Sequence, residues 1–110
     1  MDIQNTYTLF EAPKRVAERH GRSTMYYVPY DIIEDAGTYT CKYVPVTTDD
    51  YNYGGVVDAI IGVKYALKDA LAIINNYLFE PKNKEYKAEF DEMQKWRQFA
   101  KDESKKHFNL

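Results

Sequence analysis

The pattern of apolar and polar positions divides the chain into an extended first half and a helical second half. Polar and apolar residues alternate from Thr38 to Tyr43, with Cys41 on the apolar side, which is the period of a half-buried strand. The preceding residues 24–33 are rich in side chains that favour strands. Residues 34–37 end in a glycine that suits a turn. We therefore predict a β-hairpin over residues 24–46.

Three features modify the prediction for the first half. Residues 6–10 alternate briefly and predict a short strand. Residues 13–20 begin with Pro13, which fits a first helical turn, and are followed by Gly21, which fits the position after a helix end, so we predict a two-turn helix. Pro29 lacks a backbone donor and predicts that residues 24–33 form an edge strand or break there.

The second half has helical spacing. Apolar residues fall at positions 56, 60, 63, 67, 70, 71, 74, 77 and 78, which sustains a helical period for about six turns. Asp49 or Asp50 is the expected N-cap. Gly62 and residues 65–69 leave open whether residues 54–78 form one helix or two. A second long helix is predicted from Asn83 to about Lys106, and residues 107–110 are expected to fray.

These elements predict an α+β fold, in which a small antiparallel β-hairpin element packs on a C-terminal helical hairpin. We expect a single domain over residues 1–110. Residues 1–48 supply the short helix and the β-hairpin, and residues 50–108 supply the helical hairpin. The connector from residue 47 to residue 55 is too short to separate two domains.

The charge balance argues against a nucleic-acid-binding role for the domain as a whole. The 110 residues carry 15 Lys and Arg against 17 Asp and Glu, a formal charge of −2. Nucleic-acid-binding domains are usually clearly basic. A local patch of Lys14, Arg15, Arg19 and Arg22 is the candidate site for an anion or a nucleic acid. The acidic stretch over residues 31–50 of the same chain is the alternative partner of this patch.

Residues that could carry chemistry are few and scattered. His20 and His107 are far apart and Cys41 is the single cysteine, so a transition-metal site lacks ligands. Gly54 and Gly55 stand outside any phosphate-binding motif, and the spacing of residues 49–54 does not fit a calcium loop. We predict no catalytic residues, no cofactor and no metal. His20 is interpreted as a helix-end residue, His107 as part of a frayed tail and Cys41 as a small buried hydrophobe.

The aromatic content stands out, with 11 Tyr, 5 Phe and 1 Trp. Tyrosine is enriched at protein interfaces because it combines a large apolar ring with a polar tip. Tyr26 and Tyr27 are adjacent on a predicted strand and must point to opposite faces. Trp96 and Phe99 flank the apolar stripe of the last predicted helix. The candidate interface residues are therefore Tyr26, Tyr27, Tyr30, Trp96 and Phe99.

Nothing in the sequence indicates a membrane. The apolar runs are only a few residues long, far below the roughly 20 that a spanning helix needs. The first five residues lack the basic start and apolar run of a signal peptide. We expect a cytoplasmic protein, or one that leaves the cell as part of a virion.

A segment of the helical half resembles a known group of proteins. Residues 53–65 and 72–78, which end in Asn-Asn-Tyr-Leu, are followed by a Trp-Arg helix over residues 89–97 and by Ala100-Lys101. Over residues 50–106 this pattern resembles small uncharacterised proteins encoded in phage and prophage regions of Bacteroides-type gut bacteria. Such relatives often carry Ser or Asp near residues 66–69, which implies a helix break there. The resemblance implies a phage structural or accessory role.

Three hypotheses for function follow. The leading one is a non-enzymatic protein-interaction or assembly component with a protein partner or self-association, and the resemblance implies a phage structural or accessory protein. The second is a small nucleic-acid-binding regulator that uses the basic N-terminal helix, with tyrosines stacking on bases. The third, least favoured, is an enzyme or ligand-binding module with a pocket between hairpin and helices, near Cys41 and Asp50.

Overall fold

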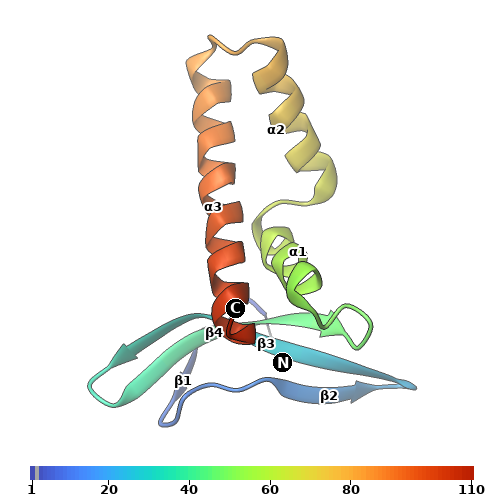
Figure 1. Ribbon diagram of the computed structural model, residues 1–110, viewed down its shortest axis with the longest axis vertical. Coiled ribbons are helices and arrows are strands. Elements are labelled where there is room, and N and C mark those ends of the chain that lie inside the picture. The colour runs from blue at the N-terminus through green and yellow to red at the C-terminus, as the bar shows by residue number, and fades with distance from the viewer. Residues whose placement is uncertain (2) are drawn as a thin grey trace.

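The computed structural model describes residue 1 and residues 3–110, and it confirms the α+β class. A four-stranded antiparallel sheet forms one end of the molecule, and three helices rise from one of its faces (Figure 1). The strands lie in the order β1-β4-β3-β2. The elements are β1 (Tyr7–Leu9), β2 (Val16–His20), β3 (Ser23–Asp35), β4 (Thr38–Thr47), α1 (Tyr53–Lys64), α2 (Leu67–Phe79) and α3 (Lys84–Phe108).

The predicted β-hairpin is formed by β3 and β4. Asp35 pairs with Thr38 across a two-residue turn in which Ala36 and Gly37 both have positive φ, 50° and 84°. Two positive φ angles are typical of a type I′ turn, whose twist matches the twist of the flanking strands. The short predicted strand at residues 6–10 is also present as β1, which pairs with β4.

The helix predicted over residues 13–20 is wrong. Residues 16–20 form strand β2, which pairs antiparallel with β3 from Val16 opposite Tyr27 to His20 opposite Ser23. Gly21 has a φ of 61°, as expected, but it serves a two-residue turn between strands rather than a helix end. Five residues gain little from helix formation, whereas pairing with the aromatic-rich β3 gives them a ladder and a packed face.

The edge position predicted from Pro29 is also wrong for the strand as a whole, because β3 lies between β4 and β2. It holds locally. β2 pairs with β3 only as far as Tyr27, so one flank of β3 is open at Pro29. The register against β4 then shifts between Tyr30 and Ile33, and Asp31 takes a φ of 53°. The bulge places the Asp31 backbone N–H 2.8 Å from Glu103 Oε1 of α3, to which it donates.

The long apolar stretch over residues 54–78 forms two helices. α1 ends at Lys64 and α2 begins at Leu67, and no side chain caps the start of α2. The N-cap of α1 is Asn52 rather than the predicted Asp49 or Asp50; Asn52 Oδ1 accepts from the Gly55 N–H at 2.9 Å. α3 begins after Asn83 as predicted but continues to Phe108, so His107 lies within the helix rather than in a frayed tail.

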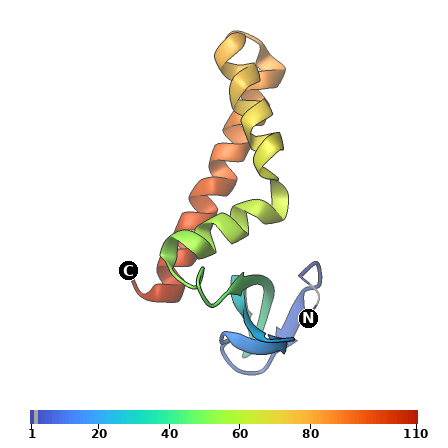
Figure 2. The same ribbon diagram turned by 90° about the vertical axis from the view of Figure 1, so that its right-hand side faces the viewer.

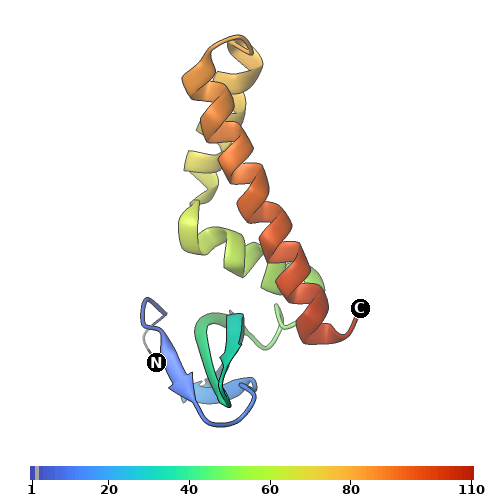
Figure 3. The same cartoon turned by 90° about the vertical axis from the view of Figure 1, so that its left-hand side faces the viewer.

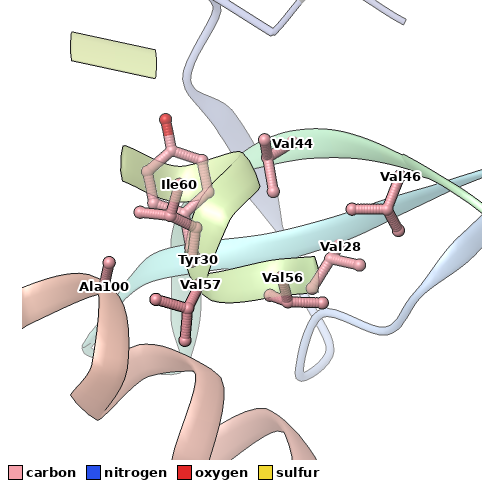
Figure 4. Close-up of a cluster of buried hydrophobic side chains, with 8 residues drawn as sticks. All are labelled: Val28, Tyr30, Val44, Val46, Val56, Val57, Ile60 and Ala100. Carbon is pink, nitrogen blue, oxygen red and sulfur yellow. The ribbon is translucent and has the colours of Figure 1, made fainter. Parts of the chain in front are cut away.

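The main core lies between the sheet and the first helix (Figure 4). Val28 and Tyr30 of β3, with Val44 and Val46 of β4, face three residues of α1, and Ala100 of α3 closes the cluster. The α1 residues are Val56, Val57 and Ile60, which are spaced to share one helix face. α1 and the C-terminal half of α3 therefore anchor the helices to the sheet.

The opposite face of the sheet is covered by the chain's own N-terminal strands. Tyr27, Cys41 and Tyr43 form a second buried cluster. Residues of both edge strands, Tyr7 of β1 and Val16 of β2, pack against it, so the sheet must curl over this face. Cys41 is 1% exposed, which confirms its interpretation as a small buried hydrophobe.

The outer part of the helical half projects away from the sheet (Figures 1 and 2). We call residues 67–92, which comprise α2 and the first turns of α3, the helical arm. The radius of gyration is 16.0 Å, against about 13 Å for a compact domain of this size. No residue of the arm belongs to either buried cluster, and the view from the other side also shows the arm projecting away from the sheet (Figure 3).

Adjacent glycines at the start of α1 give a matched pair for testing this geometry. A Cβ on Gly55 would overlap the Asp50 carbonyl oxygen, whereas a Cβ on Gly54 would meet only the Asn52 side chain at 3.6 Å. Gly55→Ala is expected to lower the free energy of unfolding by about 1–3 kcal/mol. Gly54→Ala should leave it unchanged or raise it by up to about 1 kcal/mol, because alanine favours helix. Urea unfolding of both variants measures the difference; equal effects would contradict the close approach at Gly55.

Candidate functional site

The candidate interface rings on α3 lie at the contact between α1 and α3. Trp96 Nε1 donates to the Ile60 carbonyl at 3.0 Å, and the Lys64 ammonium lies 4.7 Å from the centre of the Trp96 ring. The Trp96 and Phe99 rings stack with centroids 4.9 Å apart. Both rings are half-buried and pack on the main core. Their contacts within the chain are sufficient to explain why they are aromatic.

The three tyrosines of β3 are also engaged within the protein. Tyr27 and Tyr30 are 6% and 2% exposed. They do lie on opposite sides of the sheet, Tyr27 in the second cluster and Tyr30 in the main core. Tyr26 is half-buried, with its ring 5.2 Å from that of Tyr51. These rings therefore offer little exposed area to a partner protein.

The basic patch does not form a helical face, because residues 13–20 are not a helix. The Arg15 guanidinium lies 4.4 Å from the centre of the Tyr26 ring and 4.7 Å from that of Tyr51. Lys14, Arg19 and Arg22 are exposed around β2. Within the described part of the chain, no ion pair joins this patch to the acidic stretch over residues 31–50. Arg15 acts as a stacking partner for two rings, which adds no support to the nucleic-acid hypothesis.

A polar pair lies where the end of α3 meets the sheet. The Tyr51 hydroxyl and His107 Nε2 share a hydrogen bond of 2.6 Å. The rings of Tyr51 and Phe108 lie 5.2 Å apart, which completes an aromatic cluster with Tyr26. Burial lowers the pKa of His107 below its usual 6.5, and the nearby positive charge of Arg15 lowers it further. The histidine therefore favours its neutral form in the folded protein.

A cavity of about 240 Å³ lies beside this pair, lined by Pro13, Pro29, Ile32, Glu103, Lys106 and His107. Its polar groups already have partners. Glu103 Oε1 accepts from the Asp31 N–H, and Glu103 Oε2 lies 3.6 Å from Lys106 Nζ. His107 and Tyr51 bind each other. Each of these polar groups is thus engaged with another group of the protein.

Other side chains that could take part in a reaction also have partners within the protein. Burial raises the pKa of the Cys41 thiol, which keeps it protonated, and a hydrogen bond with Tyr43 opposes this only in part. The Ser104 hydroxyl is fully buried and donates to the Ala100 carbonyl at 2.8 Å. In residue 1 and residues 3–110, no three His, Cys, Asp or Glu residues are placed to hold a metal ion. The third hypothesis would need Cys41 and Asp50 to line one pocket; Asp50 lines a cavity at the start of α1, whereas Cys41 lies within the second cluster.

The most exposed apolar surface lies on the helical arm, where the sequence analysis did not place it. Leu67, Leu71 and Leu78 of α2 are 76%, 50% and 69% exposed, and Phe79 at its end is 86% exposed. No residue of α2, which the structure describes in full, is buried. The helical spacing includes these positions but does not show which of them face the core. We call Leu67, Leu71, Ile74 and Leu78 the α2 stripe.

α2 has a second apolar side, which packs on α3. Ala70, Ile73 and Tyr77 are partly buried there, and the Tyr77 and Phe90 rings stack with centroids 4.3 Å apart. Nearer the sheet the two helices separate around a cavity of about 420 Å³ with Asp69, Glu89 and Glu92 in its walls. α3 therefore covers one side of α2 and leaves the three leucines of the α2 stripe exposed, while Ile74 of the stripe is partly buried.

Comparisons with known proteins do not assign the chain to a family, because no family model, no curated protein and no solved structure matches it significantly. Over the described residues, no helix combines the length and apolar character that crossing a membrane requires. The candidate surfaces must therefore be weighed by their geometry alone.

The His107 pair predicts a defined pH dependence. Because the folded-state pKa lies below the unfolded value of 6.5, the stability contributed by neutral His107 is complete above pH 6.5. It falls as the pH drops through 6.5 and levels off below the folded pKa. Urea unfolding from pH 7.5 to about pH 5 should show a steeper loss for the wild type than for His107→Gln. Parallel curves would contradict the lowered pKa.

Proposed function

We propose that this protein is a non-enzymatic protein-interaction component whose contact surface is the α2 stripe. The supporting observation is that three leucines on one side of α2 are at least half exposed, on an arm that projects from the body of the fold. Apolar side chains scattered over a surface are normal, but a row of them on one helix is typical of an interaction site.

The spacing of the stripe supports this function. Leu67, Leu71, Ile74 and Leu78 follow one another at intervals of four, three and four residues. This is the spacing of the a and d positions of a helical pair, and it places the four side chains within about 60° of one another around the helix. A partner helix could therefore contact all four at once.

Burial of the α2 stripe against a partner would be energetically favourable. Fully burying a leucine side chain stabilises a structure by about 1.5–3 kcal/mol, so the exposed leucines represent a large unused contribution. α2 itself has 13 residues and no side-chain N-cap. Helices of that length are marginal in water without packing. A partner on the stripe would stabilise α2 as well as bind to it.

The non-enzymatic part of the proposal rests on how the polar groups are used. His107, Tyr51, Glu103 and Ser104 are engaged in contacts that hold α3 to the sheet or within itself. An assembly role in a phage particle is a narrower hypothesis that comes from the sequence resemblance, and none of the contacts above bears on it.

Site-specific photo-cross-linking in cells that express the protein tests this function. A photoreactive side chain at position 71 or 78 should give a discrete adduct, since both positions lie on the stripe. The control is position 76, an exposed residue about 170° from the stripe around the same helix, which should give none. No adduct at 71 or 78, or equal adducts at all three positions, would refute the proposed contact surface.

A further inference from the structure

We infer that the occupant of the α2 stripe is the α2 stripe of a second copy of this chain, packed antiparallel. This inference rests on the proposed function and names its partner. Two arms joined in this way, each with α2 and the start of α3, would form a four-helix bundle related by a two-fold axis.

The order of the stripe is symmetric, which favours self-pairing. Its intervals of four, three and four residues are the same in both directions along the helix. In an antiparallel pair, Leu67 of each copy therefore meets Leu78 of the other, and Leu71 meets Ile74. A two-fold interface requires this self-complementarity, because each residue and its contact are exchanged by the axis. Every side chain of the stripe would face an aliphatic side chain of similar size.

The shape of the molecule fits the antiparallel orientation. The sheet lies at one end of the arm, and the α2–α3 connection lies at the other (Figure 1). Antiparallel arms would place the two sheets at opposite ends of the bundle, where they do not compete for space. Parallel arms would bring both sheets, in a molecule whose extents are 47 × 40 × 26 Å, to the same end. The antiparallel helices also have opposed dipoles.

The available area indicates how tightly the copies would bind. Burying one aliphatic side chain removes on the order of 100 Å² of apolar surface from water, so the four side chains of the stripe supply at most roughly 400 Å² per copy. A stable interface of standard size buries about 800 Å² per partner. The dimer is therefore expected to be weak and to depend on concentration. The arm of a monomer would retain the open stripe that the structure shows.

Sedimentation equilibrium from about 1 µM to about 500 µM tests the pairing, a range that spans weak association. The mean mass of the wild type should rise from 12.9 kDa towards twice that value. Leu71→Ser with Leu78→Ser should stay at 12.9 kDa; both side chains are exposed, so the fold should survive, which circular dichroism checks. Ile33→Ser is the control, since Ile33 is 56% exposed but lies on β3, and it should associate like the wild type.

Cysteine cross-linking tests the orientation. An equimolar mixture of Leu67→Cys and Leu78→Cys chains should form disulfide-linked pairs between the two variants, while each variant alone forms few. Buried Cys41 should not react. Pairs formed by each variant alone would indicate parallel arms and overturn the antiparallel geometry.

The two proposals fail in different ways. A wild type that stays at 12.9 kDa at the highest concentration, or a stripe variant that associates as well as the wild type, overturns pairing with a second copy. If the cross-linker at position 78 then captures a different protein, the interaction function stands without self-pairing. If it captures nothing, both proposals fail.

Discussion

α2 has two apolar sides, and the described elements give it one substantial neighbour, α3. This imbalance determines most of what the structure implies about function. The sheet is covered over most of its area, because α1 and α3 pack on one face and the N-terminal strands curl over the other, although Ile32 and Ile33 of β3 are exposed. α1 is anchored by three buried residues on the core, whereas α2 has none. Apolar side chains such as Phe10, Ile33 and Leu110 are also exposed elsewhere, whereas α2 carries three exposed leucines in a row on one side.

The abundance of tyrosine, the most unusual property of the composition, has an explanation within the fold. A small curled sheet with two covered faces needs large side chains on both sides, and aromatic rings fill such space with few rotatable bonds. Tyr27 and Tyr43 serve the second cluster, and Tyr30 serves the main core. Tyr51 links the sheet to the last turn of α3 through His107 and Phe108. Packing within the fold thus explains the aromatic content, which does not by itself indicate a contact surface.

The sequence predicted the parts of the fold that depend on local periodicity. The β3–β4 hairpin and α3 follow from alternation and helical spacing, and both are present. The strand β2 could not be recognised because its five residues and Gly21 suit a helix end as well as a hairpin turn. Its structure is decided by pairing with β3, which is not a local property. The sequence left open whether residues 54–78 form one helix or two, because the break at Tyr65 and Ala66 is also not decided by local pattern alone.

The candidate site was missed because periodicity shows that a helix has apolar positions but not which of them face the core. Leu67, Leu71 and Leu78 belonged to the same helical pattern as Val56 and Ile60. Only the arrangement of α1, α2 and α3 separates the positions that are covered from those that are open.

Amide hydrogen exchange measured at low and at high protein concentration tests the central claim most directly. If the α2 stripe of one copy covers that of another, the α2 amides should exchange more slowly as the concentration rises, because pairing stabilises a helix that is marginal alone. The amides of α1 and of the sheet should not change. Exchange from α2 that is independent of concentration, or a slowing spread evenly over the chain, would contradict the account.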